Sequence, residues 1–156
     1  MPESQTGERA QAAGDFLLRV HADLRRELAT IRRDLEDVVA GRPVKPAPQP
    51  GIRAQLAFHC LAVCDLLSGH HTHEDGAFGY FKEQFPQLGP AIDRLTEEHE
   101  VVARSLTELR SLVASFEAGE AEPEAVLQEV IRLTADLEEH FTYEEEQLIP
   151  VLNAPD

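Results

Sequence analysis

Four stretches of this chain repeat apolar residues at alternating spacings of three and four, and a histidine interrupts each stretch. Such spacing places the apolar residues on one face of an α-helix. The interrupting residues are His21, His70, His99 and His140. A buried imidazole without a partner costs free energy, so four of them on four apolar faces call for a common explanation. A cation bound inside a bundle of four helices would satisfy all four.

The apolar pattern predicts four helices. We expect them over residues 15–40, from 52 to the low eighties, from about 91 to 117, and from 123 to about 148, ending before Pro150. Residues 1–14 are expected to form a flexible N-terminus, residues 41–51 a linker stiffened by four prolines, and residues 151–156 a C-terminal tail. Short connections favour antiparallel neighbours. The sequence therefore predicts an all-α protein, an antiparallel up-down-up-down four-helix bundle over residues 15–150.

Counting residues from the turns places the histidines at one level of this bundle. His21 and His70 each lie 19 residues from the end of their helix that meets the proline-rich linker. His99 and His140 lie 18 and 17 residues from the helix ends at the third connection. Since a helix rises about 1.5 Å per residue, these positions agree to within about one helical turn. We expect the four side chains to meet in one cross-section.

Two of the histidines are followed four residues later by a glutamate on the same helical face, giving the pairs His70–Glu74 and His140–Glu144. Imidazole nitrogens combined with carboxylate oxygens suit iron, and also manganese or zinc. A carboxylate can bridge two cations about 3.5–4 Å apart, so two glutamates from two helices suit a two-metal site. For any one of these residues the alternative is a polar position near the end of the bundle. Asp75 and Glu145 are open alternatives to the glutamates that precede them.

Charge and hydropathy exclude several other classes of protein. The formal net charge is -15, which argues against binding to nucleic acid or to an anionic membrane surface. No apolar run approaches the roughly 18 residues of a membrane span, and the opening residues do not resemble a secretory signal. We therefore expect a cytoplasmic protein, as a monomer or weak homodimer. Cys60 and Cys64, four apart on one predicted helix, are expected to be reduced core residues.

Several motifs together resemble the hemerythrin-like, or HHE cation-binding, domains over essentially the whole chain. They are His21, HHTHED (70–75), LTEEH (95–99) and HFTYEEEQLIPVL (140–152). The resemblance implies a four-helix bundle that holds a non-haem centre of two iron ions, bridged by carboxylates and by an oxo or hydroxo group. It also implies a set of iron ligands, namely His21, His70, Glu74, His99, His140 and Glu144.

The third helix departs from the pattern of the oxygen-carrying hemerythrins, which have two histidines one turn apart there. This chain has only His99, with Leu95 and Ala103 where a partner would stand. His71 is the best candidate for the missing imidazole, because an iron-sensing F-box member of the family places a ligand at the matching position. His73 is a weaker candidate.

The resemblance implies a protein that binds or reacts with dioxygen, peroxide or nitric oxide at an open iron position. The motifs leave carriage, sensing and turnover open; as an enzyme it would be a catalase-like or peroxidase-like oxidoreductase of peroxide or dioxygen. The alternatives are an iron-dependent regulatory or interaction module, and an iron storage protein without turnover. Tyr143, next to Glu144, is expected either at the helix surface or as a hydrogen-bond donor near the metal site.

Overall fold

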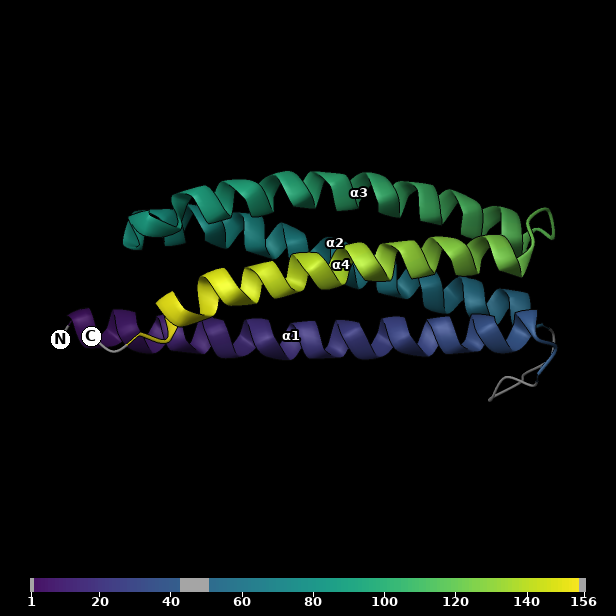
Figure 1. The fold of residues 1–156 in the computed structure, drawn as a ribbon, viewed down its shortest axis with the longest axis horizontal. Helices are drawn as coiled ribbons and strands as arrows, with labels where there is room; N and C mark the ends of the chain where they lie inside the picture. The colour runs from purple at the N-terminus through teal and green to yellow at the C-terminus, as the bar shows by residue number, and fades with distance from the viewer. Residues whose placement is uncertain (1, 43–50, 155–156) are drawn as a thin grey trace.

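The computed structural model describes residues 2–42 and 51–154 and shows four long helices in an up-down-up-down bundle (Figure 1). The elements are α1 (Pro2–Val39), α2 (Ile52–Gln84), the short 3-10 helix η1 (Pro86–Leu88), α3 (Gly89–Glu117) and α4 (Pro123–Leu152). The start of α1 and the end of α4 lie at the same end of the bundle (Figure 1). The predicted all-α bundle is confirmed.

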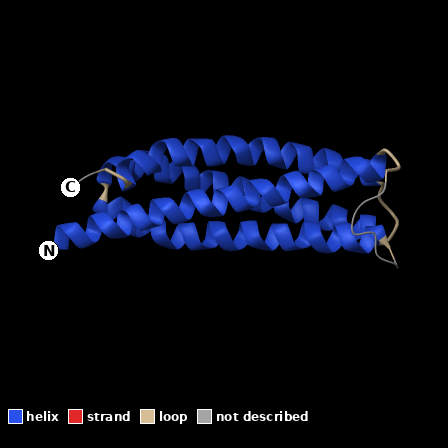
Figure 2. Ribbon diagram, turned by 90° about the horizontal axis from the view of Figure 1, so that it is seen from below, coloured by secondary structure: helices blue, strands red, loops and turns tan. Residues whose placement is uncertain are grey.

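The four helices form a square in which each contacts two neighbours. Contacts join α1 to α2 and α4, and join α3 to α2 and α4. The view turned by 90° shows the same long, parallel-sided arrangement, with loops only at the two ends (Figure 2). In the described residues, no helix has both the length and the apolar character needed to cross a bilayer.

The first helix begins much earlier than expected. The predicted start at Asp15 is wrong, because α1 begins at Pro2 and so includes most of the segment expected to be a flexible N-terminus. Ala10 is buried against the end of α4, and Gly14 is so close to α4 that an added Cβ would lie 3.1 Å from Oδ1 of Asn153. Packing against α4 thus extends the helix where no large apolar residue signals it.

The last helix continues beyond its predicted end. Pro150 lies inside α4, which runs to Leu152, so the predicted stop before the proline and the tail from residue 151 are both misplaced. A proline this close to a C-terminus removes one hydrogen bond, and the burial of Leu152 offsets that loss. Most of the predicted linker, residues 43–50, lies outside the described residues. At the end of α1, Gly41 has a φ of 73°, a left-handed conformation that favours glycine after a helix.

The apolar core consists of two clusters separated along the bundle axis. The larger includes Leu24, Leu67, Val102 and Leu137, and also holds the free thiols Cys60 and Cys64. The smaller lies toward the chain termini and includes Leu17, Phe78, Leu95 and Leu148. On every helix the predicted metal ligands fall between residues of the two clusters, so they form a polar layer inside an otherwise apolar core.

Candidate metal centre

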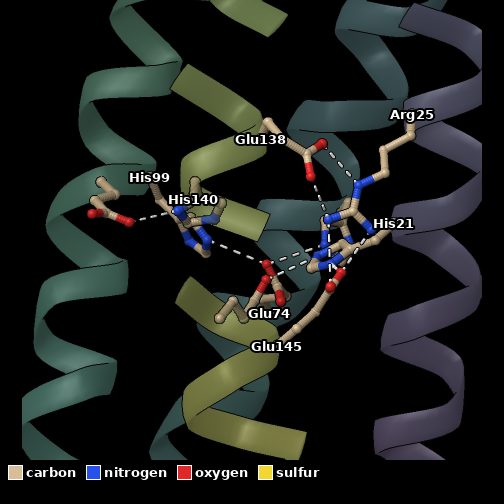
Figure 3. A network of polar contacts seen from close by, with 10 residues as sticks. His21, Arg25, Glu74, His99, Glu138, His140 and Glu145 are labelled. Carbon is tan, nitrogen blue, oxygen red and sulfur yellow. Dashed lines mark hydrogen bonds and ion pairs between the residues drawn. The ribbon is translucent and has the colours of Figure 1, made fainter. Parts of the chain in front are cut away.

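All seven residues predicted to bind metal meet inside the bundle. Each is less than 9% exposed, and both His21 and Glu144 are 0% exposed. The group comprises His21 from α1, His70, His71 and Glu74 from α2, His99 from α3, and His140 and Glu144 from α4. Figure 3 shows side chains from all four helices converging on the bundle interior. The predicted common level of the histidines is therefore correct.

The donor atoms form two groups that share one carboxylate. The two-histidine subsite consists of His21, His70, Glu74 and Glu144; the three-histidine subsite consists of His71, His99, His140 and Glu74. Within each group the donor atoms lie within 4.8 Å of one another. Glu74 lies between them, with its Oε1 3.2 Å from Nε2 of both His70 and His99. Two cations sharing Glu74 would fit this arrangement.

His71 belongs to the same cluster as the other histidines. Its ring stacks on that of His99 with the centroids 3.9 Å apart, and its centroid lies 5.1 Å from that of His140. Its neighbour His73 points elsewhere: it is exposed and contacts Phe16 edge-on, with ring centroids 6.0 Å apart. The structure thus places His71, and not His73, beside the predicted ligands.

Several buried polar atoms of this cluster make no hydrogen bond of acceptable geometry, although some lie close together, such as Nε2 of His21 and Oε1 of Glu144 at 2.9 Å. In the described part of the chain, such atoms are Nε2 of all five clustered histidines, Oε1 of Glu74, both carboxylate oxygens of Glu144, and Oε1 of Gln55. A native core normally satisfies its buried polar groups, because each unpaired group costs about 1–3 kcal/mol. Apart from Gln55, every unsatisfied atom is a donor of one of the two subsites. The residues present therefore fit a bound metal centre.

The outer nitrogens of three histidines, in contrast, are firmly held by carboxylates. Nδ1 of His21 lies 2.7 Å from Glu145, Nδ1 of His99 lies 2.7 Å from Asp75, and Nδ1 of His140 lies 2.8 Å from Glu98. When Nδ1 donates its proton to the carboxylate, Nε2 keeps its lone pair for a metal. These contacts select the tautomer that ligation requires.

The three carboxylates that hold these Nδ1 atoms are Asp75, Glu98 and Glu145. Asp75 and Glu145 do not replace Glu74 and Glu144; they contact histidines of the adjacent helices. Glu98, which precedes His99 in the chain, accepts a hydrogen bond from His140 of α4. The signal in the sequence is that each acid is directly adjacent to a predicted ligand.

Sequence reasoning missed Arg25 altogether. Its guanidinium lies 2.9 Å from Glu145 and 2.9 Å from Glu138, which links the bonded His21–Glu145 pair to the protein surface (Figure 3). Nothing in the helical spacing distinguishes Arg25 from its neighbour Arg26, which pairs with Asp23 on its own helix.

Burial favours the neutral form of three of the clustered histidines, His70, His71 and His140. Burial, together with a smaller effect of the neighbouring imidazoles, lowers the pKa of His70 to about 4 and that of His71 to about 2. Burial also lowers the pKa of His140. Neutral imidazole is the form that binds metals, so these side chains are ready to ligate at neutral pH.

The pKa values of the two buried glutamates are shifted in opposite directions. Burial raises the pKa of Glu74 well above its usual range, and the adjacent Glu144 raises it further. Burial alone would raise the pKa of Glu144 as well, but the neighbouring Glu74 and His21 outweigh it and lower that pKa. Metal binding at Glu74 therefore competes with protonation of its carboxylate.

The comparison with known families agrees with this geometry. The profile described as hemerythrin HHE cation binding domain matches residues 13–153. This chain belongs to the hemerythrin HHE cation-binding domain family. The match extends from α1 to the end of α4 and contains both subsites. No curated protein and no solved structure matches the chain.

Other polar residues of this hemerythrin-family chain lie away from the centre. His59 pairs with Glu27 at 2.7 Å near the bundle surface. Tyr143 is half-buried against the smaller cluster, and Arg94 lies over its ring, 3.8 Å from the centroid. Of the two predicted roles for Tyr143, packing near the helix surface is the one that these contacts support.

Proposed function

We propose that this chain holds two iron ions and binds dioxygen, or a related small molecule such as peroxide or nitric oxide, at an open iron position. The observation that carries the proposal is the convergence of eight unsatisfied donor atoms, from seven buried residues, into two groups that share Glu74. Nitrogen and oxygen donors without a thiolate suit iron. Bound ferrous iron would supply a redox-active centre able to take up a small molecule.

We place the open position at the two-histidine subsite, because the two subsites have four donor residues each but differ in their imidazoles. That subsite has two imidazoles, whereas the three-histidine subsite has three because His71 joins it. A cavity of about 280 Å³ between α1, α2 and α4 reaches His70 and Glu74, so a small molecule could reach the two-histidine subsite through it. With His71 in place only one position is expected to remain open, which favours reversible binding or sensing over redox turnover.

The protein residues have three tasks in this proposal. The five Nε2 atoms and the two glutamates hold the ions. The carboxylates at Nδ1 of His21, His99 and His140 fix the rings and increase their basicity. The apolar clusters on both sides of the centre exclude water, which strengthens every interaction inside.

The proposal is tested by metal analysis combined with the optical spectrum of the reduced protein before and after exposure to air. Two irons per chain and a charge-transfer band that depends on oxygen are expected. One zinc per chain would overturn the proposal. In the variant His71→Ala, the iron content and the spectrum are expected to change, and an unchanged spectrum would rule out His71 as a ligand.

A second candidate function is an iron-dependent regulatory or interaction module. It is favoured by the position of the seven polar residues, which separate the two apolar clusters. Without a cation, this layer opposes packing of the bundle, and metal binding then contributes directly to folding. The metal-free form should melt at a lower temperature and be digested faster by proteases. Equal stability with and without iron would exclude this function.

A further inference from the structure

One cavity of the bundle is wider than a diatomic ligand requires. It has a volume of about 280 Å³ and lies between the N-terminal half of α1, the second half of α2 and the end of α4. A water molecule occupies about 30 Å³ in the liquid, and an apolar cavity of about 150 Å³ is enough to bind benzene. The space beside the centre therefore has room for about two aromatic rings.

The cavity exists because small residues stand among large ones. Ala13 of α1 and Ala77 of α2 leave the space open, and aromatic rings line it, namely Phe16, Phe78 and Phe81. Aromatic rings favour contact with other aromatic rings, edge to face or offset. The wall thus suits a flat apolar molecule better than a flexible polar one.

Charge narrows the ligand class further. The ionisable residues along the lining are two histidines and one acid: His73 on the exposed side, and the buried pair His70 and Glu74 at the inner end. Among the described residues, the lining contains no lysine or arginine that could pair with an anion. Glu74 is the one acid of the described lining and offers no positive charge to an anion, and the apolar and aromatic side chains that form most of the wall favour an uncharged ligand. A neutral ligand fits these conditions.

From size, lining and charge, we propose that this cavity binds a neutral bicyclic aromatic molecule of about the size of indole, directly beside the two-histidine subsite. The inference rests on the proposed function for the metal centre, since His70 and Glu74 belong to both sites. It deepens that function, because an aromatic molecule bound in the cavity would block the path by which dioxygen or nitric oxide reaches the iron.

The binding test uses indole with the full, iron-loaded chain and isothermal titration calorimetry. We expect saturable binding of one indole per chain and at least about tenfold weaker binding of benzoate, which has a ring and a negative charge. Binding of benzoate as tight as that of indole would show that the cavity does not select neutral ligands.

Variants locate the binding to the cavity. Ala77→Phe fills the space and is expected to weaken indole binding by at least about tenfold. The matched control is Ala54→Phe, the same substitution at an exposed position of α2, and it should leave binding unchanged. If Ala77→Phe fails to fold, Ala13→Phe fills the same cavity from α1. Equal loss in the control and the cavity variants would place the binding elsewhere and overturn the inference.

A second readout separates this inference from the proposed function. Saturating indole should slow the association of nitric oxide with the reduced iron protein, and Ala54→Phe should preserve that effect. Protein that contains two irons and responds to air but binds no indole refutes the inference and leaves the proposed function intact. Protein without iron that still binds indole, with loss on Ala77→Phe, supports the cavity and refutes the iron proposal.

Discussion

The three carboxylates that accept hydrogen bonds from the proposed ligand histidines allow a graded test of the proposed metal centre. The substitutions Glu145→Gln, Glu98→Gln and Asp75→Asn keep the shape of each side chain and remove its charge. Loss of such a partner generally weakens metal affinity by about 10–100-fold, which is about 1.4–2.7 kcal/mol. All three bonds have nearly the same length, 2.7 or 2.8 Å. Their lengths therefore predict equal effects, and only their surroundings distinguish them.

Exposure to water sets the expected order. The side chain of Glu145 is 21% exposed, that of Glu98 is 29% exposed and that of Asp75 is 47% exposed. Water screens the interaction between a carboxylate and an imidazole, so the least exposed acid has the strongest influence. Arg25 also holds Glu145 in place. We expect Glu145→Gln to weaken iron affinity by nearly 100-fold and Asp75→Asn by no more than about tenfold.

The assay is anaerobic competition for ferrous iron between each variant and a coloured chelator. Glu146→Gln serves as the control, because Glu146 is exposed on the same helix as Glu145 and makes no ion pair or hydrogen bond with the described residues. An affinity loss in Glu146→Gln as large as in Glu145→Gln would attribute the effect to net charge alone. A loss that is greatest for Asp75→Asn would refute the argument from screening.

Three further predictions follow from the site and the core. Glu74→Gln should abolish binding of both metal ions, because Glu74 belongs to both subsites; retention of two irons per chain in elemental analysis would contradict its shared position. Leu137→Ala should lower the free energy of unfolding by about 2–5 kcal/mol, since Leu137 is 0% exposed; urea unfolding measures this, and a loss below about 1 kcal/mol would show that the core relaxes around the site. Burial raises the pKa of the Cys60 thiol to about 12, so iodoacetamide at pH 7 should label it only after unfolding, because the thiolate is the reactive form; rapid labelling of the native protein, read by mass spectrometry, would refute this.

Much of the site could be predicted from the sequence because it depends on helical spacing and on the level of residues along the bundle. His21 lies between Leu17 and Leu24 on a regular apolar face, which fixes its inward direction. Its distance from the turn then fixes its height. The direction and the height of a side chain both depend on one helix alone, so an error of a few residues at a helix end changes them little.

What the sequence did not reveal depends on contacts between helices. The extension of α1 to Pro2 follows from packing of Ala10 and Gly14 against α4, and an alanine or glycine gives no hydrophobic period to detect. The cavity beside His70 is likewise an effect of missing side-chain volume. Spacing on one helix predicts which residues face inward, but it does not show how much space remains between the helices.

The contacts around the centre follow an order that no single helix contains. An acid of α2, Asp75, accepts from the histidine of α3; an acid of α3, Glu98, accepts from the histidine of α4; and an acid of α4, Glu145, accepts from the histidine of α1. In each case the acid is the chain neighbour of a ligand residue, so one helical position faces the centre and the next, about 100° away, reaches the adjacent helix. A rotation of α2, α3 or α4 would therefore disturb both a proposed ligand and the partner of a proposed ligand on the next helix. The proposed metal centre and the packing of the bundle are in this way specified by the same pairs of residues.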